Sequence, residues 1–380
     1  MDFKFNEDQQ LLQTMFSEFV EAAVEPVAAE LDEKEMFPEE LIPQMGEIGM
    51  MGITVPEDLG GVGLGMVETT LAVEEIAKAC ASTAIAVGIH NTLACWPIQK
   101  FGTDAQKEAY LADMASGEKL GAFALTEPNV GSDAAGVATT AVEQDDCYVL
   151  NGSKSFITNG ERASVYIVIA ATDKAAGKKG LSAFIVEKGM PGFNFDGHEK
   201  KMGIRGSATH GLTFEDVKVP KENMLGKPGE GLKIALTAIN GVRIAIAAQA
   251  CGIAQHAIDL ATKQVQERTQ FGRTIASFQN TQFTLADMQT RVDASRLLTY
   301  RAAAQMDAGE DYASAAAMAK LFASETASYV TGKAVQLYGG YGYSREYPVE
   351  RLMRDAKITE LYGGTSEVQK IVISRKMGLN

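Results

Sequence analysis

The sequence predicts an α+β protein built from an N-terminal α-helical domain, a middle antiparallel β domain and a C-terminal helical bundle. Three observations predict this order. Apolar residues recur at helical spacing in the first third, short β-rich runs separated by turn residues follow, and long alanine-rich helical patterns fill the remainder. We place the domains at residues 1–120, 121–232 and 233–380, in a chain long enough to bury a large core.

The N-terminal domain is predicted from helical periodicity. Between residues 8 and 30 the apolar side chains that share this spacing are Leu12, Met15, Phe16 and Phe19. Either Asn6 or Asp8 can cap the start of this helix, because a short polar side chain accepts hydrogen bonds from the first free backbone N–H groups. Further helices are expected near residues 66–80 and 104–116.

The middle domain is predicted from short β-rich runs near residues 147–150, 164–170, 181–186 and 212–214. Turn pairs such as Asn151-Gly152, Asn159-Gly160 and Pro191-Gly192 lie between them. Because no helix-length apolar pattern interrupts these runs, we expect a small antiparallel sheet over residues 121–232.

The C-terminal domain is predicted to be helical throughout. One face of a long helix is formed by Ile244, Ala247, Ala248, Cys251, Ile258 and Val265. Residues 281–308 and 312–337 repeat the pattern and are rich in Ala, Met and Leu. The small alanine side chains let helices approach closely, as in a bundle.

Composition excludes several classes of protein. The 35 basic and 49 acidic side chains give a net charge of −14, which repels nucleic acid and anionic membrane surfaces. The four cysteines form no C-x-x-C pair, which argues against a disulfide framework or a zinc site and for a reducing compartment. The N-terminus lacks the pattern of a signal peptide, and no apolar run reaches 18 residues. We therefore expect a cytoplasmic protein without nucleic-acid or membrane partners.

Common catalytic and nucleotide-binding motifs are absent. No G-x-G-x-x-G follows a strand, and there is no P-loop, H-E-x-x-H or G-x-S-x-G sequence. The four histidines are widely spaced, so no metal site is expected. Any cofactor must therefore be bound through less general motifs.

Four segments stand out as candidates for binding a cofactor or substrate. They read F-A-L-T-E-P-N-V-G-S-D at 123–133, S-F-I-T-N-G at 155–160, E-R-T-Q-F-G-R at 267–273, and Q-L-Y-G-G-Y-G-Y at 336–343 with D-A-K-I-T-E-L-Y-G-G-T-S-E at 355–367. Taken singly, the first three are also typical of a capped loop, a hairpin and a solvated charge run. The glycine pairs of the fourth allow the backbone to approach a flat or anionic group.

Together and in this order, the four segments resemble the acyl-CoA dehydrogenase family over essentially the whole chain, most closely its short-chain, butyryl-CoA-type members. The resemblance implies FAD bound between the middle domain and a C-terminal four-helix bundle. It also implies an acyl-CoA substrate, an electron-transfer flavoprotein as electron acceptor, and a homotetramer in which a neighbouring subunit completes the FAD site.

The resemblance assigns cofactor contacts to three sets of residues. The isoalloxazine would be contacted by Phe123, Leu125, Thr126, Phe156 and Thr158, with Gly131 and Ser132 holding pyrophosphate or the CoA pantetheine. The pyrophosphate and adenine would be bound by the partner's copy of Arg268, Phe271, Gln279, Gln336, Leu337, Gly339 and Gly340. The other end of FAD would be contacted by Thr365 and Glu367.

The same resemblance implies a substrate site formed by Ser132, Asn240, Arg243, Tyr362 and Gly364. Most members of the family carry an aspartate where this chain has Asn240. In the family, the thioester carbonyl binds a flavin ribityl hydroxyl and a backbone N–H, which acidifies the α-proton. The backbone N–H at position 363 is retained here, so polarisation of the carbonyl is expected to persist.

The catalytic base of the family is missing from this chain. Most members carry the glutamate base in a Y-E-G-T segment, which here reads Tyr362-Gly363-Gly364-Thr365. A minority place it one residue before the arginine matched by Arg243, where this chain has Val242. Loss of a positioned base costs roughly 10²–10⁴ in rate, which argues against ordinary α,β-dehydrogenation of a straight acyl chain.

Three explanations remain open. The chain can be a short-chain dehydrogenase inactivated at its base, or a non-redox acyl-CoA lyase of the desulfinase type that retains FAD. It can also resemble the cyclohex-1-ene-1-carboxyl-CoA dehydrogenases, which carry out a 1,4-elimination with an aspartate base from the N-terminal domain. The corresponding position here is Asn91, next to His90, a second candidate base. We expect the alicyclic type, with Gly363 and Asn91 as the two positions that decide catalysis.

Overall fold

The computed structural model describes residues 4–379. The N-terminal domain is helical, as predicted, and the side chain of Asn6 caps the first helix by accepting from the backbone N–H of Gln9 at 2.8 Å. Short π-helical segments of five and six residues, hereafter called π-turns, interrupt the helices at Val20–Val24 and His90–Cys95. The α-helices are α1 (Glu7–Phe19), α2 (Glu25–Glu33), α3 (Leu41–Glu47), α4 (Met66–Ala79), α5 (Ala81–Ile89), α6 (Trp96–Phe101) and α7 (Asp104–Ala115).

The middle domain is an eight-stranded sheet in which β6, β7, β3, β2, β4, β5 and β8 are neighbours in that order, with β1 beside β4. Most pairs are antiparallel, as predicted, but β1 runs parallel to β4 and β2 makes one parallel pair with it. The sheet is therefore mixed. Its strands are β1 (Gly121–Ala124), β2 (Thr140–Glu143), β3 (Cys147–Thr158), β4 (Val165–Ala171), β5 (Leu181–Glu187), β6 (Phe193–His198), β7 (Thr209–Pro220) and β8 (Met224–Leu225).

The C-terminal domain contains three long helices, α8 (Gly231–Glu267), α9 (Gln279–Asp307) and α10 (Ala313–Tyr338). The shorter α11 (Val349–Ile358) packs against α8 and α10 as a fourth helix, and α12 (Ser366–Lys376) ends the domain. A short hairpin of β9 (Thr269–Gln270) and β10 (Arg273–Thr274) joins α8 to α9. The expected boundary at residue 121 coincides with the start of β1, and the one at 233 falls just inside α8.

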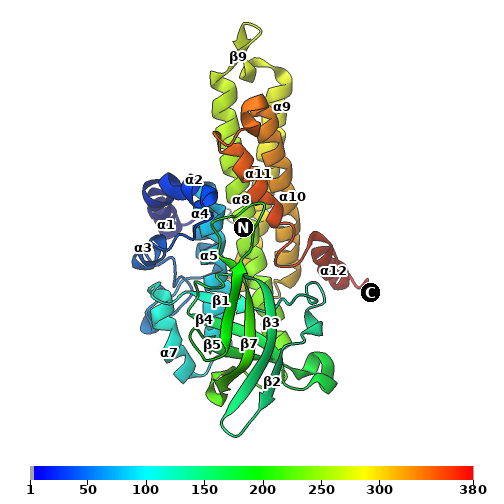
Figure 1. The fold of residues 1–380 in the computed structure, drawn as a ribbon. Helices are drawn as coiled ribbons and strands as arrows, with labels where there is room; N and C mark the ends of the chain where they lie inside the picture. The colour runs from blue at the N-terminus through cyan, green and yellow to red at the C-terminus, as the bar shows by residue number, and fades with distance from the viewer. Residues whose placement is uncertain (1–3, 380) are drawn as a thin grey trace.

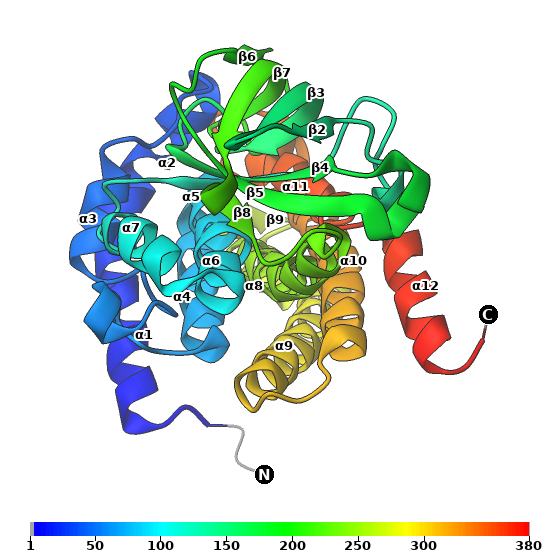
Figure 2. The same cartoon turned by 90° about the horizontal axis from the view of Figure 1, so that it is seen from below.

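Helix α8 is the axis on which the three domains assemble. In Figures 1 and 2 the sheet lies beside one end of α8, α4 and α5 pack along it, and the β9 hairpin projects from the opposite end. Contact with α4 requires Gly252, because a Cβ there would lie 2.3 Å from the carbonyl oxygen of Glu74. Among the described residues, α8 alone has the length and apolar composition of a membrane span. Because 78% of its most apolar window is buried inside the fold, this is weak evidence for one.

Candidate active site

A buried ion pair holds the loop that follows β1. The Nζ atom of Lys154 lies 2.8 Å from a carboxylate oxygen of Glu127 and also donates to the carbonyls of Leu125 and Ile169 at 3.1 and 2.7 Å. Glu127 in turn accepts from the backbone N–H groups of the loop before β2. Both charged groups thus have several partners, which is what makes a buried ion pair tolerable. The pair ties the loop carrying Leu125 to the sheet.

Protonation of this ion pair reflects both its burial and its partners. Burial lowers the pKa of Lys154 to about 8, against the opposing effect of the Glu127 carboxylate. Burial alone would raise the pKa of Glu127, but the hydrogen bond and charge of Lys154 bring that pKa below its usual value. The pair is therefore ionised at neutral pH.

The first two predicted segments meet beside this loop. The backbone N–H of Ser155, on β3, donates to the carbonyl of Thr126 at 2.9 Å, which places Thr126 next to Phe156. Phe123 and Leu125 are buried and Thr126 is half-buried, whereas the predicted phosphate or pantetheine contacts, Gly131 and Ser132, are exposed.

Phe156 occupies a strained position at an irregularity in β3. Its φ of +57° is unusual for a bulky residue, and the pairing of β3 with β7 shifts register between Lys154 and Ile157 at this point. The ring is 65% exposed instead of joining the core. Such strain persists where the surrounding structure enforces it, often at functional sites. The exposed ring and the nearby half-buried Thr158 leave a surface on which a flat ring system can pack.

The turn after Phe156 is anchored to the N-terminal domain. The amide of Asn159, at φ +63°, donates to the carbonyls of Ala86 and Gly121 at 3.2 and 3.0 Å. The backbone N–H of Gly121 donates to Nδ1 of His90, whose Nε2 lies 3.0 Å from the carbonyl of Met114. Both ring nitrogens of His90 are thus engaged and burial lowers its pKa to about 4, so this histidine is a neutral structural group in this arrangement.

Asn91 is fully buried in the π-turn that follows α5. Its Nδ2 atom donates to the carbonyls of Met50 and Val87 at 2.9 and 3.1 Å, while its Oδ1 atom has no hydrogen-bond partner among the described residues. An aspartate at position 91 would turn a carboxylate oxygen toward two carbonyl oxygens. The amide at this position therefore anchors the turn.

The C-terminal glycine pair forms a left-handed turn with φ values of +63° at Gly363 and +94° at Gly364. The carbonyl of Gly363 accepts from Nε of Arg243 at 3.1 Å, and that of Gly364 accepts from Nζ of Lys320 at 2.8 Å and Nε2 of Gln369 at 2.7 Å. A Cβ on Gly363 would point at the apolar side chains of α8, 2.5 Å from Cδ1 of Ile246. The predicted base position is thus apolar and closely packed against α8.

The other predicted substrate contacts surround this turn. Arg243 is buried and bonds Asn240 Oδ1 at 2.8 Å in addition to Gly363, so its guanidinium lies within the protein interior. The hydroxyl of Tyr362 donates to the side-chain oxygen of Gln249. Thr365 caps α12 by accepting from the backbone N–H of Val368 at 3.4 Å, and Glu367 is exposed.

The residues predicted to hold the nucleotide half of FAD gather at the other end of α8. Arg268 and the glycine pair at 339 and 340 line one pocket of about 600 Å³, together with Gln270, Ile275, Gln336, Leu337, Tyr338 and Tyr341. Phe271, at the tip of the hairpin, is 92% exposed, and Gln279 is exposed at the start of α9. This brings together the third segment and the first part of the fourth.

The two halves of the predicted FAD site do not meet within one chain. The hairpin with Arg268 lies at one end of the 37-residue helix α8 and the sheet with Phe156 at the other, as Figure 1 shows. A helix of this length spans about 55 Å. One bound dinucleotide could contact both sets only if a second chain supplied one of them.

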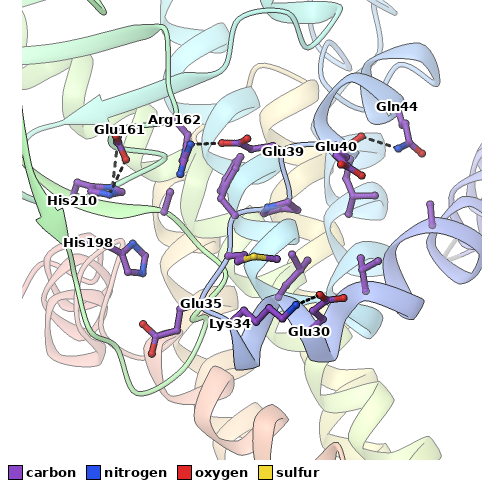
Figure 3. Close-up of a pocket in the computed structure, with 18 of the residues that line it drawn as sticks. Glu30, Lys34, Glu35, Glu39, Glu40, Gln44, Glu161, Arg162, His198 and His210 are labelled. Atoms are coloured by element: carbon purple, nitrogen blue, oxygen red, sulfur yellow. Dashed lines mark hydrogen bonds and ion pairs between the residues drawn. The ribbon is translucent and has the colours of Figure 1, made fainter.

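A separate cleft of about 920 Å³ lies between α2, the following loop, and the middle domain. Figure 3 shows its charged rim, in which Glu30 pairs with Lys34, Glu39 with Arg162, and Glu161 with His210. The sequence gives no signal for this cleft, because its lining comes from segments far apart in the chain. Residues 4–379 contain no cluster of His, Cys, Asp and Glu suited to a metal ion.

Sequence reasoning missed Lys154, Lys320 and Gln369. The available signal was the placement of a lysine inside an otherwise buried strand or alanine-rich helix, since such residues are rarely buried unless paired. The two lysines bond backbone carbonyls in other segments, and Lys154 also bonds the Glu127 carboxylate, which no sequence pattern identifies.

Comparison with known proteins identifies one family for all three domains of the chain. Family models described as the N-terminal, middle and C-terminal domains of acyl-CoA dehydrogenase match residues 6–118, 122–217 and 229–378. A short-chain specific acyl-CoA dehydrogenase of Clostridium acetobutylicum is 50% identical over 99% of this chain and 100% of the relative. An acryloyl-CoA reductase (NADH) of Anaerotignum propionicum is also 50% identical, over 99% of this chain and 96% of the relative.

Solved structures show the same fold. Butyryl-CoA dehydrogenase from Megasphaera elsdenii superposes with a TM-score of 0.98 at 47% identity, covering 99% of this chain and 100% of that one. A chain from a structure described as the electron transferring flavoprotein of Acidaminococcus fermentans gives a TM-score of 0.98 at 51% identity, covering 99% of each chain. This chain therefore belongs to the acyl-CoA dehydrogenase family and is a FAD-dependent oxidoreductase that acts on the CH–CH group of an acyl-CoA.

Proposed function

We propose that the protein oxidises a short or alicyclic acyl-CoA without a glutamate base at position 363, and that its preferred substrate is of the cyclohex-1-ene-1-carboxyl-CoA type. The observation that carries this proposal is the apolar, carboxylate-free surrounding of Gly363. The position faces Ile246 and Val242, so it offers an apolar wall for a ring and no acceptor for an α-proton. A 1,4-elimination gives a hydride from one ring carbon to FAD and releases a proton from another ring carbon, so the water or side chain that accepts this proton need not stand at position 363.

The residues present suit FAD in three respects. The exposed Phe156 offers a flat apolar surface, the Arg268 pocket offers a cation and close backbone approach, and the turn at 363–365 offers backbone donors. FAD, when bound, accepts the hydride. The chain itself would bind the isoalloxazine beside Thr126 and Thr158 and orient the thioester carbonyl at the glycine pair. Val242 and Ile246 would shield the acyl group from water.

We further infer an oligomer, because the two predicted halves of the FAD site lie at opposite ends of α8, and we propose the homotetramer that is typical of the family. An electron-transfer flavoprotein is the proposed electron acceptor. The similar chain from the structure described as the electron transferring flavoprotein of Acidaminococcus fermentans supports this proposal. The net charge of −14 supports an enzyme that binds neither nucleic acid nor an anionic membrane surface.

Oxidation of a straight chain is the second candidate, favoured by the named short-chain relatives and the butyryl-CoA dehydrogenase structure. It requires that a group other than the missing glutamate remove the α-proton of the acyl chain. Loss of a positioned base lowers the rate by about 10²–10⁴, so butyryl-CoA should be a poor substrate.

Anaerobic mixing of the FAD-loaded protein with each thioester tests the proposal. We expect the flavin absorbance to bleach with cyclohex-1-ene-1-carboxyl-CoA and to change far more slowly with butyryl-CoA. Product release without bleaching would assign the chain to the non-redox lyases instead. Binding without bleaching or turnover would identify a CoA-ester binding protein and end the proposal.

Restoring a carboxylate sharpens this test. Gly363→Glu combined with Ile246→Val, which removes the atom 2.5 Å from the new Cβ, should raise the rate with butyryl-CoA, and Ile246→Val alone is the control. Asn91→Asp should lower stability without improving ring oxidation, because Asn91 already donates to two carbonyls. A gain in ring oxidation with Asn91→Asp would show instead that position 91 holds the base.

A further inference from the structure

Lys320 is buried in a way that the stability of the fold does not explain. Its side chain is fully shielded from solvent, yet among the described residues its Nζ atom has one hydrogen-bond acceptor, the carbonyl of Gly364 at 2.8 Å. The other buried lysine, Lys154, has a carboxylate and two carbonyls as partners. A lysine is rarely buried without a paired acid, because desolvation of its charge is costly.

The neighbour of Lys320 makes this arrangement more costly still. Arg243, also buried, approaches the same turn and donates to the carbonyl of Gly363. Burial and the charge of Arg243 lower the pKa of Lys320 to about 7, and burial lowers that of Arg243 to about 10. The acid with the largest effect on the pKa of Lys320, Glu360, instead bonds Ser328 and Lys357. Two cations therefore converge on two consecutive carbonyls without a carboxylate in contact.

Peptide geometry turns these contacts into an orientation of donors. In a trans peptide the carbonyl of one residue and the N–H of the next point in opposite directions. Holding the carbonyls of Gly363 and Gly364 toward Arg243 and Lys320 therefore directs the N–H groups of Gly364 and Thr365 away from them. Within residues 4–379, the N–H groups of 363, 364 and 365 donate no hydrogen bond.

We propose that Lys320 is a positioning residue, which together with Arg243 holds the Gly363–Gly364 turn so that its amide groups bind the thioester carbonyl of the acyl-CoA. The inference rests on the proposed function and names a residue that acts through the backbone. Glycine pairs are flexible because they lack Cβ atoms, so this turn needs outside contacts to keep its donors aligned. The charge of Arg243 and of the protonated fraction of Lys320 also favours the negative charge that develops on the thioester oxygen.

Infrared difference spectroscopy on the FAD-loaded protein tests this role, with butyryl-CoA carrying ¹³C at the thioester carbonyl as the probe. Hydrogen bonding to the carbonyl lowers its stretching frequency in the bound state. In Lys320→Met we expect most of that shift to disappear and the dissociation constant to rise about tenfold, which corresponds to about 1.4 kcal/mol. Lys320→Arg should retain most of the shift, because it keeps the charge and a donor.

Protein stability separates positioning from a merely structural role. Gly364 keeps Gln369 as a donor in Lys320→Met, so the unfolding midpoint and FAD content should stay close to wild type. Lys333→Met, on the same helix and away from the turn, is the control and should keep the full shift. If Lys320→Met retains too little FAD for spectroscopy, Lys320→Gln replaces it with a neutral donor and a smaller frequency shift is expected.

The outcomes separate this inference from the function on which it rests. A shift in the wild type that survives in Lys320→Met and Lys320→Gln overturns the positioning role and leaves the proposed function intact. A wild type that binds the probe without any shift overturns both. Loss of stability with an unchanged shift would make Lys320 a structural residue only, and it would end the inference.

Discussion

At the scale of single residues, Asp355 is the buried group with the clearest consequence for pH dependence. Its carboxylate accepts from the backbone N–H of Ile204 at 2.5 Å, across the boundary between the C-terminal and middle domains. The neighbouring Arg354 bonds Asp32 of α2 at 2.7 Å and the carbonyl of Met202 at 3.3 Å. These two adjacent residues therefore connect all three domains. Burial raises the pKa of Asp355 to about 6.

Replacing this carboxylate should change how stability responds to pH. An acid whose pKa is raised on folding, here from 3.8 to about 6, favours the folded state at low pH and loses that contribution as pH rises through this window. Asp355→Asn stays neutral and can still accept from Ile204. The difference between its free energy of unfolding and that of wild type should therefore rise between pH 4 and 6, by at most about 3 kcal/mol. Above pH 6 this difference should stay constant.

Urea unfolding at several pH values measures this difference. Asp196→Asn, on β6, is the control for a general effect of removing one negative charge. A difference between Asp355→Asn and wild type that does not vary with pH would contradict the raised pKa.

At the scale of elements, function depends on irregularities in regular structure. The bulge in β3 turns Phe156 outward, and the loop between β1 and β2 is held by Lys154 from within β3. Both devices keep the residues predicted to contact flavin in fixed positions. Asn91, in the π-turn after α5, likewise fixes the end of that helix by donating to the carbonyl of Met50. Each device uses a residue that local propensity alone would not select.

Breaking the ion pair beneath the loop should cost both stability and cofactor. In Lys154→Met the carboxylate of Glu127 stays buried and loses its cation, which typically costs about 3–5 kcal/mol. We expect the urea midpoint to fall and FAD to be lost on dialysis, because the loop with Thr126 is no longer tied to the sheet. The exposed Lys178→Met is the matched control. Full FAD retention in a folded Lys154→Met protein would show that the pair does not organise the cofactor site.

Element prediction from the sequence worked where one face of an element is buried and the other is solvated. The helices near 8–30, 104–116 and 281–308 were predicted from this periodicity, and the structure confirms them with small shifts at their ends and a π-turn at Val20–Val24. The helix near 66–80 is also confirmed, although most of its residues are buried. Residues 81–95 are all buried, so the π-turn and its flanking helices leave no periodic signal. Strands β1 and β6 were also missed, because four to six residues with glycine carry little pattern.

At the scale of the whole molecule, the two predicted halves of the FAD site lie far apart within one chain. The sheet with Phe156 and the pocket with Arg268 lie at opposite ends of α8, so the cofactor proposal requires a second chain. Under this proposal, assembly with that chain completes the site. It also explains why Phe271 can remain almost fully exposed in a single chain.

Mixing of two defective chains tests the shared site. Thr126→Tyr should block the flavin half and Arg268→Glu the nucleotide half, so each variant alone should bind little FAD. After co-expression, mixed pairs contain one intact and one doubly altered site, and roughly a quarter of all sites should bind FAD if pairing is random. Flavin absorbance per chain measures this recovery. Its absence, in assemblies shown to contain both chains, would mean that each chain forms its own site.

Local periodicity and motifs along the chain were enough to predict the three-part architecture, the family and the glycine at the position expected for the glutamate base. Tertiary structure alone decided what surrounds those motifs. In the tertiary structure, Arg243 and Lys320 donate to the carbonyls of the glycine pair, and Asn91 donates to two backbone carbonyls. Arg268 and Phe156 lie at opposite ends of α8. The physical reason is that burial and hydrogen bonding depend on contacts between segments far apart in the chain. No local pattern of residues records such contacts.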